Sequence, residues 1–146
     1  MKKQLDPVKY ELLYNKLANI LEEGKENLRY LSGSTITREA GEVVMGYYLP
    51  NGEAALMATG ILIHIMNVTG CIRYMNENNF DEDIGIYEGD MFLNNDPYIG
   101  GQHTPDCALV APVFHKGELL GYIASIAHTT EMGAIEPGSM SPRATE

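Results

Sequence analysis

Cysteine is scarce in this 146-residue sequence, and the chain has no CxxC motif. Its two cysteines, Cys71 and Cys107, are typical of reduced core residues in an intracellular protein rather than of a disulfide framework. The N-terminal sequence MKKQLDPVKYELL also lacks the apolar segment of a secretory leader. These absences predict a cytoplasmic protein.

Basic residues and long apolar runs are scarce as well. Lys and Arg total 10 against 20 Asp and Glu, which gives a formal net charge of -10. An acidic balance disfavours nucleic acid and anionic membranes as partners, and it favours a solvated surface or docking onto a basic subunit. The longest apolar run, residues 54–68, is interrupted by Thr59, Gly60 and His64 and is too short and too polar to span a membrane.

Apolar residues make up 45% of the chain, which is enough for the core of one domain, residues 1–146. Asp6 followed by Pro7 is typical of a helix start, and apolar residues then recur at helical spacing. Gly24 weakens the middle of this helix. We therefore expect a long N-terminal helix within residues 1–33.

Two hairpins are predicted after this helix. Asn51-Gly52 separates strand candidates at residues 43–49 and 53–59, and Asn67 is a candidate N-cap, so residues 40–78 form a hairpin plus a helix. Residues 76–90 are acidic and loop-like, and residues 91–93 are a short strand.

Residues 107–114 and 119–127 form the second hairpin, within a segment 90–146 that ends in a loop-like tail. The order of elements predicts an α+β fold, in which a long helix accompanies a mixed or antiparallel sheet built from hairpins. Because the tail has no closing element, we expect the fold to continue beyond residue 146.

Ligand-type side chains gather at one end of the second hairpin. The stretch NNDPYIGGQHTPDCALV, residues 94–110, contains His103 and Asp106. If Lys116-Gly117 forms the two-residue loop, residue 128 lies opposite residue 105. His128 then arrives one position from Asp106 and two from His103. Directly opposed side chains lie about 5 Å apart and diagonal ones about 7–8 Å.

Strand parity complicates this convergence. Opposed residues share a face, so a regular ladder would direct Asp106 and His128 to opposite faces. A one-residue bulge at Pro105, or a three-residue loop, would restore the facing. The spacing therefore permits a cluster of ligands without requiring one.

Two histidines and one carboxylate form a set that leaves coordination positions open, which suits Fe(II), Mn(II) or Zn(II). Gly100 and Gly101 permit a sharp turn and a close approach of the backbone to a ligand. The preceding polar residues are candidates to orient the imidazoles; they are Asn94, Asn95 and Asp96.

For the remaining candidate residues, an ordinary structural role is an alternative to a functional one. His115 lies in the turn and is expected to be exposed, and His64 follows an apolar segment and is expected to be buried and bonded to backbone. Glu131 and Asp96 are candidates for proton handling, with an ordinary loop carboxylate as the alternative.

The runs GDMFLNNDPYIGGQHTPDCALVAPVF, GELLGYIASIAH, EPGSM and ATE resemble the hydantoinase B/oxoprolinase family, which includes the large subunits of acetone and acetophenone carboxylases. DPVKYELLYNKLANILEE resembles the N-terminal helix of that family, and TREAGEVVMGYYLPNGEAAL resembles the hairpin after it. The resemblance covers nearly the whole chain, but family subunits are several times longer. Gly60 stands where many relatives carry a histidine.

The resemblance implies a divalent metal (Mn, Fe or Zn) held by His103, Asp106 and His128. It also implies a hydantoinase A-like partner subunit that uses ATP to activate a small carbonyl or cyclic amide substrate, so ATP is bound by the partner and this chain has no cofactor-binding residues of its own. The complex would carry out carboxylation, as a ligase, or ring hydrolysis, as a hydrolase. The alternative is a truncated, non-catalytic assembly fragment of such a complex, and whether the isolated chain is active stays open.

Overall fold

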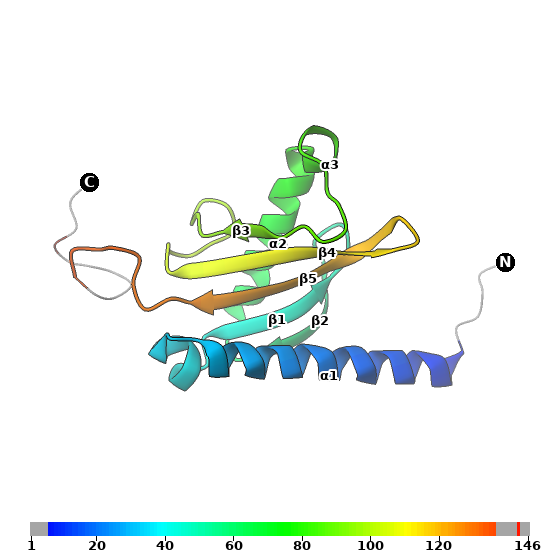
Figure 1. Cartoon of the computed structure of the whole chain (residues 1–146), viewed down its shortest axis with the longest axis horizontal. Helices are drawn as coiled ribbons and strands as arrows, with labels where there is room; N and C mark the ends of the chain where they lie inside the picture. Colours follow the sequence, from blue (N-terminus) through cyan, green and yellow to red (C-terminus); the bar gives the residue numbers. More distant parts are fainter. Residues whose placement is uncertain (1–5, 137–142, 144–146) are drawn as a thin grey trace.

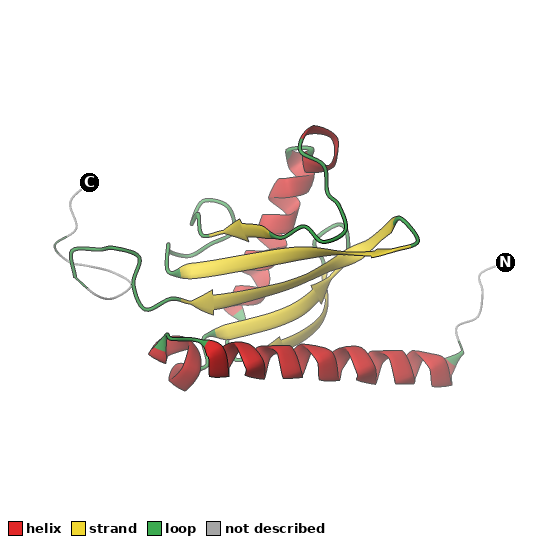
Figure 2. Ribbon diagram, in the orientation of Figure 1, coloured by secondary structure: helices red, strands yellow, loops and turns green. Residues whose placement is uncertain are grey.

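The computed structural model describes residues 6–136 and residue 143. In chain order the elements are α1 (Pro7–Leu31), the π-helix η1 (Ile36–Ala40), β1 (Val43–Tyr48), β2 (Ala54–Thr59), α2 (Ile63–Glu77), α3 (Phe80–Asp83), β3 (Phe92–Asn94), β4 (Asp106–His115) and β5 (Glu118–His128). The strands form one five-stranded sheet in the order β2-β1-β5-β4-β3 (Figures 1 and 2). Every neighbouring pair is antiparallel, so the predicted α+β fold is confirmed.

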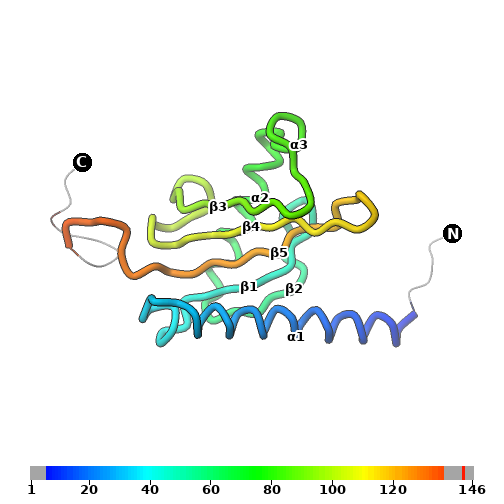
Figure 3. Tube along the Cα trace, in the orientation of Figure 1, coloured from blue at the N-terminus to red at the C-terminus, as the bar shows by residue number. Residues whose placement is uncertain are grey.

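Helix α1 begins where the sequence predicts. The Asp6 carboxylate accepts a hydrogen bond from the Val8 N–H, and Pro7 occupies the first helical position. Helix α1 continues through Gly24 without interruption. Gly24 lies against β1, and a Cβ at this position would overlap with the sulfur of Met45. The small residue therefore allows α1 to pack closely along β1 and β2 (Figure 3).

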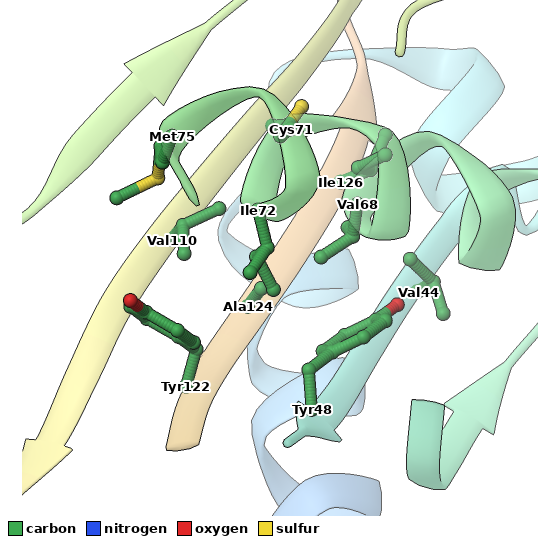
Figure 4. Packing of buried hydrophobic residues seen from close by; sticks show 11 residues of the cluster. Val44, Tyr48, Val68, Cys71, Ile72, Met75, Val110, Tyr122, Ala124 and Ile126 are labelled. Carbon is green, nitrogen blue, oxygen red and sulfur yellow. The ribbon is translucent and has the colours of Figure 1, made fainter. Parts of the chain in front are cut away.

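Helix α2 covers the other face of the sheet. Met45 faces α1, whereas its neighbour Val44 belongs to the core on the α2 side, as strand alternation requires. Figure 4 shows the buried side chains of α2 above those of the strands. The members of this core are Val44, Tyr48, Val68, Cys71, Ile72, Met75, Ala108, Val110, Tyr122, Ala124 and Ile126.

The start of α2 differs from the prediction. The helix begins at Ile63, so Asn67 lies within its second turn and is buried rather than acting as the N-cap. The strand before it ends at Thr59, and Gly60 donates its N–H to the Val43 carbonyl in a close approach to Gly41. The end of β2 therefore agrees with the predicted strand, and only the predicted start of the helix is wrong.

The β4–β5 hairpin has the predicted two-residue loop. Lys116 and Gly117 have φ values of 53° and 82°, as a type I′ turn requires. The register then shifts between Val113 and Phe114, so that Leu120 is an extra residue on β5 and Asp106 pairs with His128. The bulge is therefore real, but its predicted position at Pro105 is wrong.

The position of this bulge has a physical explanation. The Leu120 carbonyl accepts a hydrogen bond of 2.7 Å from the Tyr47 hydroxyl, which satisfies the backbone group that the bulge displaces. Gly121 follows with a φ of 154° and packs so tightly on the Tyr48 carbonyl that a side chain would clash with it. Contacts with β1 therefore fix the irregularity near the turn.

The loop between β3 and β4 packs on α2. Gly100 has a φ of 81°, and a Cβ at this position would lie 2.5 Å from the carbonyl oxygen of Asn67. A Cβ on Gly70 would lie 2.8 Å from the Gly100 Cα. The expectation that Gly100 approaches a ligand is thus corrected, because this glycine approaches the backbone of α2.

Candidate metal centre

Three predicted ligands meet at one end of the β4–β5 hairpin. Asp106 begins β4, His128 ends β5, and the two are directly opposed in the ladder. His103 lies in the turn just before β4, and its carbonyl accepts a hydrogen bond of 3.1 Å from the Asp106 N–H. One ligand atom from each residue lies within 4.8 Å of the other two.

The geometry within this trio is compact. The His103 Nε2 lies 3.4 Å from the Asp106 Oδ2, and the rings of His103 and His128 meet edge to face with centroids 4.8 Å apart. Asp106 is only 3% exposed, and its Oδ1 has no hydrogen-bond partner among the residues that the structure describes. A buried carboxylate oxygen without a partner is costly. A divalent cation between these three groups would remove that cost, so the donor set fits a metal.

The backbone fixes the orientation of His128. Its Nδ1 lies 2.6 Å from the Thr129 carbonyl, which can only accept, so Nδ1 carries the proton and Nε2 carries the lone pair. Thr37 of η1 donates its hydroxyl to the His128 carbonyl at 2.7 Å. This arrangement is typical of histidines that bind a metal. The hydrogen bond from Nδ1 fixes the tautomer, so that Nε2 can bind the ion.

Two further titratable residues line the same hollow, which has a volume of about 180 Å³. Glu42 precedes β1, and its carboxylate lies 3.9 Å from the His128 Nε2. Sequence reasoning missed Glu42 because only the pairing of β1 with β5, with Val43 opposite Ala127, brings it to this end of the sheet. Once those strands are placed side by side, an acidic residue just before β1 is the signal that identifies it.

His64 is the second of these residues. It lies in the first turn of α2 and is 3% exposed, which confirms the expected burial. The expected bond to backbone is wrong: its Nδ1 lies 3.5 Å from the Asn67 amide nitrogen, and its Nε2 has no hydrogen-bond partner within the described part of the chain. Burial lowers the pKa of His64, and the nearby carboxylates of Asp106 and Glu42 oppose that effect.

The two residues predicted to handle protons lie outside the hollow. Asp96 is exposed, and its Oδ1 accepts a hydrogen bond of 2.9 Å from the Tyr98 N–H. The Glu131 Oε1 accepts hydrogen bonds of 2.8 and 3.0 Å from the N–H groups of Met132 and Ala134. Both carboxylates organise their own loops, and their catalytic roles stay predictions.

The neighbouring asparagines also bind backbone. Asn94 donates to the Ile99 carbonyl at 2.9 Å, and Asn95 donates to the Thr104 carbonyl at 3.2 Å. These bonds shape the loop that leads to His103, whereas direct orientation of the imidazoles was expected. His115 is exposed, as predicted, but it is the last residue of β4 and pairs with Glu118, so its predicted place in the turn is wrong.

Most of the EPGSM motif and all of the ATE motif lie outside the described residues. Within residues 6–136, no helix is both long enough and apolar enough to cross a membrane.

Comparison with known proteins identifies relatives of this chain. The chain is 33% identical over 139 residues to the acetone carboxylase alpha subunit of Xanthobacter autotrophicus, covering 95% of this chain and 18% of that protein. It is 31% identical to the 5-oxoprolinase of Dictyostelium discoideum, covering 95% of this chain and 11% of that protein. The chain therefore spans about a fifth or less of the length of these curated relatives.

The fold has a solved counterpart. The nucleotide-free structure of acetone carboxylase, an enzyme of ATP-dependent acetone carboxylation, superposes on this chain with a TM-score of 0.85 at 34% sequence identity. The match covers 92% of this chain and 18% of that one. The family model for hydantoinase B/oxoprolinase matches residues 6–146. The chain that carries this histidine and aspartate cluster therefore belongs to the hydantoinase B/oxoprolinase family.

Proposed function

We propose that this chain is the metal-binding part of a hydantoinase B-like subunit. The observation that carries the proposal is the cluster of His103, Asp106 and His128, whose ligand atoms lie within 4.8 Å of one another; the Asp106 Oδ1 is buried and has no hydrogen-bond partner among the described residues. The sequence of this region is similar to that of enzymes whose activities are known.

These three residues would hold a divalent cation, with Mn, Fe and Zn as the candidates. When bound, the cation supplies Lewis acidity to a carbonyl or enolate oxygen. The Glu42 carboxylate beside His128 adds a second negative charge, so Asp106 and Glu42 together would balance a divalent ion. The Thr129 carbonyl holds the His128 Nε2 in the form that can ligate.

The names of the relatives support a proposal for the partner and the substrate. One is a carboxylase subunit, another is a 5-oxoprolinase, and the solved counterpart is named for ATP-dependent acetone carboxylation. We therefore assign to this chain a hydantoinase A-like partner that uses ATP and a small ketone or cyclic amide as substrate, in the cytoplasm. The reaction would be carboxylation or ring hydrolysis.

A second candidate function is assembly without catalysis. It is favoured by the apolar side chains that α1 exposes, which include Val8, Leu12, Leu13 and Ile20 at 67%, 58%, 68% and 57%. Such a face is typical of a surface that packs on another part of a complex. Size-exclusion chromatography with and without the partner subunit distinguishes the two functions. A metal-loaded monomer that does not elute with the partner would argue against a role in assembly.

Metal analysis tests the proposed function. The purified 146-residue chain should take up one Mn²⁺, Fe²⁺ or Zn²⁺ per molecule in titration calorimetry and elemental analysis. His103→Ala should abolish that uptake, whereas His115→Ala, the matched change at an exposed histidine, should not. A wild-type chain without stoichiometric metal, or equal uptake by His103→Ala, would contradict the proposal.

A further inference from the structure

His64 is a buried polar group whose Nε2 has no hydrogen-bond partner in the described part of the chain. The residue is 3% exposed and lines the hollow that also contains His103, Asp106 and His128. Its Nε2 has no hydrogen-bond partner among the described residues. Because a buried imidazole nitrogen is normally satisfied, this orphan indicates that something besides the described protein atoms binds there.

The contact with Asn67 identifies what His64 offers to the hollow. The amide nitrogen of Asn67, which can only donate, lies 3.5 Å from the Nδ1 of His64, so this contact favours the tautomer in which Nδ1 accepts. A neutral imidazole that accepts at Nδ1 carries its hydrogen on Nε2. His64 therefore presents a hydrogen-bond donor to the hollow, whereas His128 carries its proton on Nδ1, at the Thr129 carbonyl.

This tautomer distinguishes His64 from the ligand trio. A metal ligand needs a lone pair on the nitrogen that faces the ion, and His64 has a hydrogen there. His64 also stands outside the compact group whose ligand atoms lie within 4.8 Å of one another. It comes from α2, while the trio comes from β4, β5 and the turn before β4. The hollow of about 180 Å³ has room for a ligand of a few atoms.

We propose that His64 donates a hydrogen bond from Nε2 to an oxygen atom of a small ligand bound at the His103, Asp106 and His128 centre. The ligand class is a carboxylate, bicarbonate, carbonyl or enolate, whose oxygen accepts from a neutral donor while it occupies an open position of the ion. This inference rests on the proposed metal site and adds to it a residue that orients the bound molecule.

Two variants separate a donor from a ligand and from a structural residue. His64→Gln keeps an N–H donor at a similar reach, and His64→Leu removes the donor while keeping an apolar side chain of moderate size. The probe is acetohydroxamate, titrated calorimetrically into the metal-loaded 146-residue chain. Far-UV circular dichroism and thermal unfolding establish that each variant is folded.

The donor role predicts a specific pattern of affinities. His64→Leu should weaken acetohydroxamate binding about 10-fold, the loss expected for one hydrogen bond. His64→Gln should restore the affinity to within about 3-fold of wild type, and both variants should bind Mn²⁺ within about 3-fold of wild type. Unchanged probe binding in His64→Leu would overturn the inference, and so would a loss of Mn²⁺ affinity of about 30-fold or more, which indicates a ligand.

Nitrogen-15 spectra of the Zn²⁺-loaded wild-type chain give a readout that needs no variant. The His64 ring should show a protonated Nε2 and an unprotonated Nδ1, and saturation with acetohydroxamate should shift the Nε2–H signal. A protonated Nδ1 would overturn the inference, and so would an Nε2–H signal whose chemical shift does not change when acetohydroxamate is added. If the wild-type chain binds no metal, the proposed function itself is wrong. If it binds metal but its affinity for acetohydroxamate does not depend on His64, only this inference is wrong.

Discussion

Asp106 lies directly opposite His128 across β4 and β5, and the extra residue Leu120 is the reason. The two-residue loop at Lys116-Gly117 would by itself place His128 opposite Pro105. The bulge near the turn shifts the ladder by one position and puts the carboxylate and the imidazole on the same face. The candidate centre therefore depends on an irregularity at the far end of the same hairpin.

Metal binding should stabilise the fold through Asp106. At a free metal concentration about 100 times the dissociation constant, linkage predicts a gain of about 2.7 kcal/mol in the free energy of unfolding. Asp106→Asn should abolish this gain. Without metal it should be neutral or stabilising, because it removes a buried carboxylate whose Oδ1 has no hydrogen-bond partner among the described residues. Denaturant unfolding with and without Mn²⁺ measures both effects. Asp83→Asn, on exposed α3, is the control and should retain the full gain.

Thr37 should be important for stability at the end of β5. Its hydroxyl donates to the His128 carbonyl at 2.7 Å from a fully buried position. Thr37→Val should cost about 1–3 kcal/mol in the free energy of unfolding, because the carbonyl loses its buried donor. Thr35→Val, at an exposed position of similar chemistry, should change stability by less than about 0.5 kcal/mol. Equal effects of the two changes would refute this role.

Gly100 and Gly117 form a matched pair of glycines. Their φ values are 81° and 82°, but a Cβ on Gly100 meets the Asn67 carbonyl at 2.5 Å, and a Cβ on Gly117 meets nothing within 4 Å. Gly117→Ala should therefore cost only about 1–2 kcal/mol for the left-handed backbone. Gly100→Ala adds an overlap with main-chain atoms and should cost about 1–3 kcal/mol more. Chemical denaturation of both variants checks the difference, and a smaller loss for Gly100→Ala would show that the loop can move away from α2.

Cys71 should make stability fall at alkaline pH. Burial raises the pKa of this thiol above its ordinary value of 9.0, against an opposing hydrogen bond from Asn94. As the pH rises through about 9, the unfolded chain loses the thiol proton first, so the folded state binds more protons and becomes less stable with increasing pH. The stability contributed by the protonated Cys71 is fully present below the pKa of the thiol in the unfolded chain. It is lost as the pH rises from that pKa to the higher pKa of the folded state.

Cys71→Ala should therefore flatten the fall in unfolding free energy that begins near about pH 9. Burial also raises the pKa of Tyr48 above its ordinary 10.0, so a later decline should remain. Cys107→Ala is the comparison, and it should have a smaller effect because Cys107 is only partly buried. Denaturant unfolding between neutral pH and about pH 10 measures the slopes, and identical slopes for wild type and Cys71→Ala would contradict the assignment.

Local signals in the sequence were sufficient for much of the fold. Asp6 and Pro7 determine the start of α1, and the positive φ values required at Lys116 and Gly117 determine the hairpin loop. Long-range pairing was not predictable in the same way. The end of β2 at Thr59 agrees with the predicted strand, but α2 begins at Ile63, four residues before the predicted N-cap Asn67, after Gly60 packs against Gly41.

The candidate site shows the same division. His103, Asp106 and His128 belong to one hairpin and its preceding turn, so counting along the chain brings them to the same end of the hairpin, but only the bulge at Leu120 places Asp106 directly opposite His128. Glu42 and His64 reach the hollow only because β1 pairs with β5 and α2 packs on the sheet. Their separation from the hairpin in sequence hides them, since nothing local to either residue indicates its neighbours.

The close approach of Gly70 and Gly100 also has a consequence for selectivity. These glycines bring main-chain atoms of α2 and of the loop before His103 into direct contact, so a sliding motion of the helix would carry the loop with it. Main-chain atoms cannot relax by changing rotamer, so the two walls of the hollow keep a constant separation. A change in the volume of the hollow would then require different inward-pointing side chains, because α2 and the loop cannot move apart independently.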